Sequence, residues 1–138
     1  MNAQNALKNY QHIDHQSAVE SASPHHLIHM LMEGALSRIA RAKGCIQHDD
    51  IAEKGIQIGK AISIIGGLQG SLDMDVKGDI ASNLDNLYDY MARRLYDANK
   101  DNDMDALDEV SSLIKEIKSA WDAIPEEHHF DSNKHKRE

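Results

Sequence analysis

One long stretch without glycine or proline, residues 79–100, constrains the fold of this chain more than any other feature. Its apolar residues recur in steps of 3, 4, 3, 4 and 3. They are Ala81, Leu84, Tyr88, Met91, Leu95 and Ala98. A seam of period 3.5 is typical of a helix that packs lengthwise against other helices. At 1.5 Å per residue this helix is about 30 Å long, so the chain needs further helices of similar length to cover it.

The first of those helices is predicted to begin at Ser23-Pro24 and to run to about Gln47. Serine is a favoured N-cap, and proline suits the next position, where its missing N–H costs nothing. The apolar face of this segment covers more than half a circle on a helical wheel, so one neighbouring helix cannot bury it. We therefore expect the helix to be central or to offer a face to a partner. The face contains Leu27, Ile28, Met30, Leu31, Met32, Ala35, Ile39, Ala42 and Ile46.

Two more segments carry helix-start signals. Asp50, followed three residues later by Glu53, indicates a second helix that runs to about Leu72. Asp103 is a good N-cap for the last helix, which Pro125 ends. The predicted core stripe of the second helix is Ile51, Ile58, Ala61, Ile62, Ile65, Leu68 and Leu72. That of the last helix is Leu107, Val110, Ile114, Ile117, Trp121 and Ile124.

Four helices joined by short connections predict an all-α fold, an antiparallel up-down four-helix bundle over residues 23–125. Residues 1–22 are polar and are expected to form a mobile or loosely docked N-terminal arm or short helix, with Leu7 and Tyr10 on its apolar face. The polar tail, residues 126–138, is predicted to be disordered.

Composition narrows the function. The 138-residue chain fits one domain, and its net charge of −8 argues against binding nucleic acid or an anionic membrane surface. No apolar run approaches the ~18 residues of a membrane span, and the N-terminus lacks the pattern of a secretory signal. A soluble cytoplasmic protein is expected.

No motif for catalysis or metal binding is complete. Nine histidines occur, but the HHLIH stretch around His25 and His29 contains no HExxH pattern, and we expect these residues to be solvated near a helix start. Cys45 is the only cysteine and is predicted to be a packing residue. We therefore expect no enzyme, no metal, no cofactor and no small-molecule substrate.

Two non-enzymatic alternatives remain open. A histidine phosphotransfer domain also has four helices, but it commonly carries a Lys-Gly pair soon after an exposed histidine. Lys43-Gly44, Lys54-Gly55 and Lys77-Gly78 do not follow a histidine in that way. A structural helical adaptor for a folded partner is the other alternative.

Several apolar residues fall outside the predicted stripes. Together they suggest a groove for an amphipathic helical segment, a standard mode of peptide recognition. The same pattern would also arise from an ordinary core with a geometry that the helical wheel misjudges. The candidate groove residues are Ile28, Met32, Ile39, Ile56, Ile64, Leu87 and Tyr90.

Three stretches resemble the FliS family of flagellin-specific export chaperones. SASPHHLIHMLMEGALSRIARAK is similar to the first-helix signature of that family, and IASNLDNLYDYMARRLYDAN to its third-helix signature. EKGIQIGKAISIIGGLQGSLD and the closing Trp121 also match, so the resemblance covers residues 10–124. Met32 and Glu33 depart from it, because the family often has an aromatic residue and an aspartate there.

The resemblance implies a helical bundle that binds the C-terminal segment of flagellin in the cytoplasm. That segment is disordered before assembly and becomes helical on the chaperone, which prevents premature polymerisation and keeps the subunit ready for export. In such proteins the N-terminal arm also docks the complex on the export gate protein FlhA. The matching positions of the arm here are Leu7 and Tyr10.

Overall fold

The structure is a computed structural model that describes residues 23–128. Within that range four α-helices are followed by one short 3-10 helix, and no strand is present. The helices are α3 (Pro24–Gln47), α4 (Ile51–Gly70), α5 (Ile80–Asp101), α6 (Met104–Asp122) and η1 (Glu126–His128). The four predicted helices are therefore confirmed. The predicted arm lies outside the described residues, and of the predicted tail only residues 126–128, which form η1, lie inside them.

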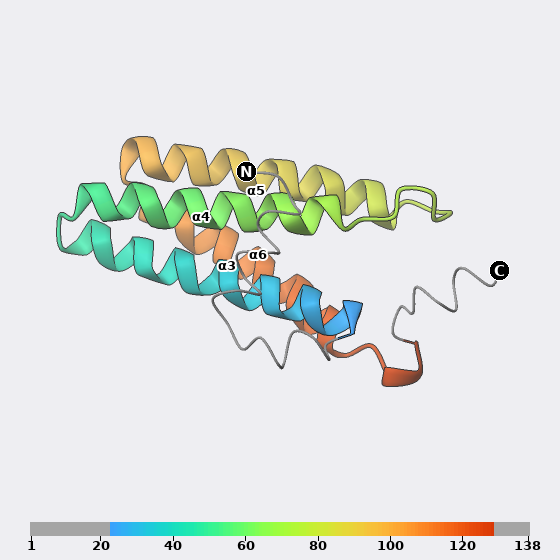
Figure 1. Ribbon diagram of the computed structural model, residues 1–138. Coiled ribbons are helices and arrows are strands. Elements are labelled where there is room, and N and C mark those ends of the chain that lie inside the picture. Colours follow the sequence, from blue (N-terminus) through green and yellow to red (C-terminus); the bar gives the residue numbers. More distant parts are fainter. Residues whose placement is uncertain (1–22, 129–138) are drawn as a thin grey trace.

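The helices alternate in direction and enclose one core (Figure 1). Each of them packs along two neighbours, in the closed order α3–α4–α5–α6–α3, and the α3–α4 pair has the most extensive contact. The predicted helical bundle is confirmed.

Local capping explains where the helices begin. The side chains of Ser23, Asp50 and Asp103 each accept a hydrogen bond from the backbone N–H three residues later, at 3.1, 3.3 and 3.1 Å. These bonds satisfy N–H groups that the first turn of a helix leaves without a partner. Asp79, before α5, makes no such bond.

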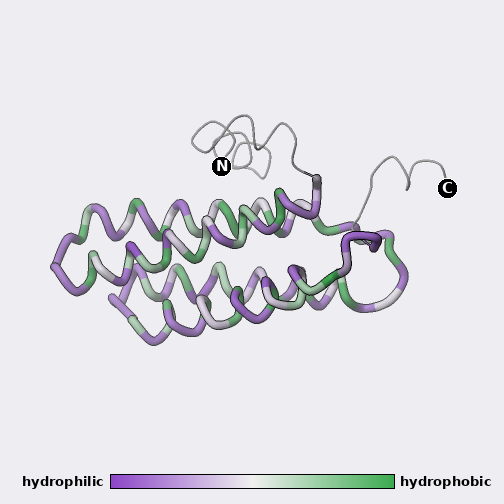
Figure 2. Tube along the Cα trace, turned by 90° about the horizontal axis from the view of Figure 1, so that it is seen from below, coloured by the Kyte–Doolittle hydropathy of each residue, from purple (hydrophilic) through white to green (hydrophobic). Residues whose placement is uncertain are grey.

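The seam of α5 lies in the core, as its period predicts. Tyr88, Met91, Leu95 and Ala98 are at most 3% exposed. Hydrophobic and hydrophilic segments alternate along each helix, as expected for helices with one face inside a bundle (Figure 2). The buried part of α6 consists of Ala106, Leu107, Val110 and Ile114.

Three of the candidate groove residues are core residues instead. Met32 is 2% exposed, Ile39 1% and Ile64 7%, so the expectation that they lie outside the core is wrong. The physical reason is that α3 packs against both α4 and α6, and α4 against both α3 and α5. A helix that packs against two neighbours buries a wider part of its circumference than the narrow line of residues that repeats every 3.5 positions. Conversely, Ile51 was predicted to be in the core and is 54% exposed.

Two hydrogen bonds and a ring stack join the start of α3 to the end of α6, and we call this set of contacts the His25–Trp121 lock. Trp121 donates its indole N–H to the carbonyl of His25 at 2.9 Å, and His25 Nε2 lies 2.8 Å from the carbonyl of Trp121. The two rings stack at 4.6 Å. Because a carbonyl oxygen only accepts, Nε2 of His25 carries the proton. His25 is 7% exposed, which corrects the expectation that it is solvated.

Replacing Trp121 by phenylalanine tests this lock. Trp121→Phe removes the donor to the His25 carbonyl, and we expect the free energy of unfolding to fall by about 1 kcal/mol. Urea denaturation followed by circular dichroism measures the change. An unchanged free energy would show that the lock contributes nothing to stability.

Burial of Tyr88 predicts a loss of stability at high pH. Burial raises the pKa of its phenol from 10.0 to about 12. The unfolded chain therefore ionises Tyr88 first, so this residue's contribution to stability is complete below pH 10 and is lost as the pH rises from 10 to 12. The loss is on the order of 2 kcal/mol.

The measurement is urea unfolding at pH 9 and at pH 11.5. Tyr88→Phe is expected to lose less stability between these pH values than the wild type, and Tyr96→Phe, on the surface of the same helix, is the control. Equal losses in the wild type and in Tyr88→Phe would contradict the prediction.

Candidate functional site

The described residues contain no site for metal chemistry. No group of three or more His, Cys, Asp or Glu residues within 23–128 could hold a metal ion. Cys45 is half-buried, and burial together with the carboxylates of Asp50 and Glu53 raises the pKa of its thiol, which disfavours the reactive thiolate. In the same range, no helix has the length and apolar character needed to cross a membrane.

A groove of about 470 Å³ runs between α4 and α5 on the outside of the bundle. Its α4 side extends from Gly55 to Gln69, which is about 21 Å at 1.5 Å per residue. That length matches about four turns of a partner helix. The lining residues are Gly55, Ile58, Gly59, Ile62, Ser63, Ile65, Gly66, Gln69, Ala92, Tyr96 and Asn99.

Small residues of α4 keep the groove open. Gly55, Gly59 and Gly66 line it, and a Cβ atom added at Gly59 or Gly66 would meet no other atom within 4 Å. Glycine inside a helix costs about 0.5–1 kcal/mol relative to alanine. Close packing among the described residues therefore does not explain why glycine stands at these two positions. Without side chains there, the surface of α4 stays concave.

The α5 side of the groove is formed by Ala92, Tyr96 and Asn99. Tyr96 is 63% exposed, although it is a large aromatic residue on a well-packed helix. Tyrosine offers a rigid apolar ring and a polar hydroxyl at low cost in conformational entropy, and for that reason it is common in binding sites.

Both ends of the groove have fixed polar groups. At one end, Gln69 donates its side-chain N–H groups to Asp85 Oδ1 and to Asp89 Oδ1, each at 2.8 Å. At the other end, the buried Lys54 donates to the carbonyl of Asn99 at 2.8 Å and also to the Asn102 side chain. This ammonium caps the last turn of α5, where the helix dipole favours a cation.

The residues that the sequence pattern suggested for a groove do not line this one. Ile28 and Leu87 are partly buried against the core. Ile56 is 49% exposed on α4 but lies outside the lining. Tyr90 donates its hydroxyl to Glu109 Oε2 at 2.7 Å, and this hydrogen bond raises the pKa of Tyr90.

The predicted arm residues, Leu7 and Tyr10, lie outside the described residues. The residues that the sequence interpretation missed are Tyr96 and the glycines. The spacing of Gly55, Gly59 and Gly66 places them on one side of α4, and this was a signal that the sequence did contain.

The pattern that defines the flagellar protein FliS matches residues 6–128 of this chain. The chain belongs to the FliS family. The flagellar secretion chaperone FliSB of Pseudomonas aeruginosa is 52% identical over 124 residues, which are 90% of this chain and 98% of that protein. The flagellar secretion chaperones FliS of Vibrio cholerae and Salmonella typhimurium are 45% and 47% identical, over 90% and 86% of this chain and 91% and 88% of theirs.

Membership of the FliS family confirms the resemblance seen in the sequence. FliS proteins are chaperones and not enzymes, in agreement with the prediction that this chain is not an enzyme. The phosphotransfer alternative receives no support from it.

The open space above the groove glycines predicts the effect of alanine. Gly59→Ala should raise the free energy of unfolding by about 0.5–1 kcal/mol, because the methyl group meets no neighbour and alanine favours the helix. Gly78 has a φ of 101°, so Gly78→Ala, the control, should lower stability by about 1 kcal/mol. Urea denaturation measures both variants. Destabilisation by Gly59→Ala would show that the space above α4 is not open.

Proposed function

We propose that this FliS-family protein is a cytoplasmic export chaperone that binds the disordered C-terminal segment of flagellin in the groove between α4 and α5. Binding prevents premature polymerisation, and the complex is delivered to the flagellar type III export gate through FlhA. The observation that carries this proposal is the open, partly apolar groove, about 21 Å long, on the outside of a well-packed bundle.

The shape of the groove suits an amphipathic helix. Apolar side chains from both helices line it: Ile62 from α4 and the ring of Tyr96 from α5, with the buried Ile58 and Ile65 beneath the α4 surface. A helix laid in such a groove buries its apolar face, which is a standard mode of peptide recognition. A client that is disordered when free loses entropy as it becomes helical, so the net affinity stays moderate. Moderate affinity suits a client that must later be released.

Other predicted contacts have secondary roles in this proposal. Ile28, Ile56, Leu87 and Tyr90 retain exposed surface and are candidate contacts for parts of the client outside the groove. Met32, Ile39 and Ile64 are not proposed as contacts, because the client would have to open the core to reach them. The arm, through Leu7 and Tyr10, is proposed to engage FlhA.

Calorimetry tests the proposed function. Titration of the full chain with a peptide of the flagellin C-terminal segment should show saturable binding with a clearly negative heat-capacity change, because apolar surface is buried. A scrambled peptide of the same composition is the control. Absence of binding at high micromolar concentration would contradict the proposal.

Alanine substitutions at two exposed residues of α5, one inside the groove and one outside it, test where the flagellin peptide binds. Tyr96→Ala removes the exposed aromatic wall of the groove and should raise the Kd for the flagellin peptide about tenfold. Ile80→Ala is the matched control, since Ile80 is 77% exposed at the start of the same helix and does not line the groove. Circular dichroism should show both variants folded. Equal Kd values for the two variants would place the client elsewhere.

A further inference from the structure

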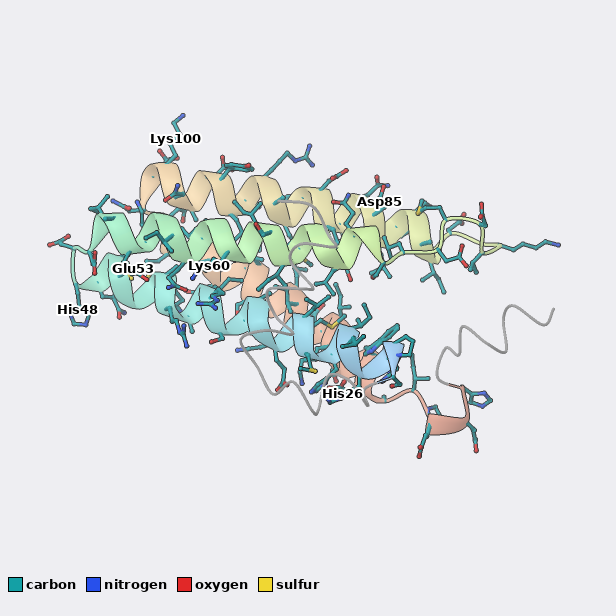
Figure 3. All side chains as sticks on the ribbon, viewed as in Figure 1. His26, His48, Glu53, Lys60, Asp85 and Lys100 are labelled. Carbon is teal, nitrogen blue, oxygen red and sulfur yellow. The ribbon has the colours of Figure 1, made fainter. Side chains whose placement is uncertain are left out.

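The helices α4 and α5 run antiparallel, and one contact between them fixes which residues lie level with each other. Glu53 and Lys100 lie near one end of the bundle, whereas Asp85 lies toward the other end (Figure 3). A Cβ atom added at Gly55 would lie 3.9 Å from Asn99 Oδ1, so these two residues are level. Counting along both helices from this pair gives the level of the other lining residues.

Gly59 lies level with Tyr96 in this register. Gly59 follows Gly55 by about one helical turn on α4, and Tyr96 precedes Asn99 by about one turn on α5. Gly59 and Tyr96 both line the groove, yet a Cβ atom added at Gly59 would meet no atom within 4 Å. The groove therefore contains an open space above Gly59 and beside the Tyr96 ring, which we call the Gly59 hollow.

Neither core packing nor a hydrogen bond within residues 23–128 explains the tyrosine at position 96. Its side chain is 63% exposed, and its hydroxyl makes no hydrogen bond to a described residue. The other two tyrosines of α5 differ, because Tyr88 is buried in the core and Tyr90 donates to Glu109. An exposed aromatic ring beside an open space is a suitable wall for an apolar side chain of a partner.

The second open glycine of the groove, Gly66, has no such wall. A Cβ atom added there also meets no atom within 4 Å, but Gly66 lies seven residues after Gly59 and is therefore level with Asp89. No α5 residue before Ala92 lines the groove. Ile62 lies between the two glycines on α4 and borders both. Of the two open glycines, only Gly59 has a large side chain of α5 beside it.

We propose that the Gly59 hollow is the anchor pocket for one large apolar side chain of the bound client. That side chain fills the space above Gly59 and packs against Ile62 and the Tyr96 ring. A few well-packed side chains typically carry most of the binding energy of an interface. Glycine suits position 59 because any larger residue would occupy the pocket itself. This inference rests on the proposed function and adds the residues that select a client side chain.

Filling the hollow separates binding from folding. Gly59→Leu places a side chain in the pocket and should raise the Kd for the flagellin C-terminal peptide about tenfold. Circular dichroism should show a folded chain, because leucine favours a helix more than glycine does. Gly44→Leu is the matched control, since a Cβ atom added at Gly44 also meets no atom within 4 Å and Gly44 lies on α3, outside the groove lining. Equal Kd values for the two variants would overturn the anchor pocket.

A double-mutant cycle identifies the anchored side chain. Each large apolar residue of the peptide is replaced by alanine in turn, and calorimetry measures binding to the wild type, to Gly59→Leu and to Gly66→Leu. One replacement should raise the Kd about tenfold with the wild type and with Gly66→Leu, but less than about twofold with Gly59→Leu.

Two results of this cycle would overturn the inference. One is that every replacement has the same effect on all three proteins, and the other is that a replacement depends on Gly66 as strongly as on Gly59. If the wild type does not bind the unaltered peptide, the proposed function itself fails, and the two failures are distinguishable.

Discussion

The apolar seam of α5 must be covered along its whole length, and the rest of the structure depends on this constraint. Leu95 and Met91 are each 0% exposed, which no single neighbouring helix would achieve. The bundle solves the problem by placing α5 between α4 and α6, and α3 between the same two helices on the other side of the core. Capping at Ser23, Asp50 and Asp103 fixes where three of these helices begin.

The inner side of α4 packs in the core, whereas its outer side leaves open space. Ala61, Ile65 and Leu68 are at most 1% exposed and belong to the shared core. On the outer side, Gly59 and Gly66 leave space that a methyl group could fill without a clash. A helix selected for stability alone would carry alanine at these positions. The stability lost to glycine is consistent with a surface kept for another chain, as expected when function and stability compete.

The sequence predicted what depends on local chemistry. Helices start at Ser23, Asp50 and Asp103 because these side chains accept a hydrogen bond from the backbone N–H three residues later. The buried seam of α5 follows from the 3.5-residue spacing of its apolar residues. Burial on α3 and α4 was less predictable. On a helical wheel, Met32, Ile39 and Ile64 fall outside the single apolar stripe expected for each helix. They are buried because α3 and α4 each contact two neighbouring helices. The periodicity of one helix does not reveal how many neighbours that helix has.

Features that join distant parts of the chain were not predictable from local pattern. His25 was expected to be solvated, yet its partner Trp121 lies 96 residues away, and only the antiparallel arrangement of α3 and α6 brings them together. The groove has the same origin, because its walls come from α4 and α5 and exist only once these helices are placed side by side. Family membership identifies the class of protein, but the groove came from the structure.

The most direct test of the groove as the client site is chemical-shift mapping of the ¹⁵N-labelled chain with the flagellin C-terminal peptide. The amides of Gly55, Gly59 and Gly66 report on one wall, and those of Ala92 and Tyr96 on the other. The account predicts that the largest shift changes occur at these positions and that the outward-facing residues of α3 and α6 change little. Saturable binding with the largest changes on α3 and α6, and none at the groove glycines, would contradict it.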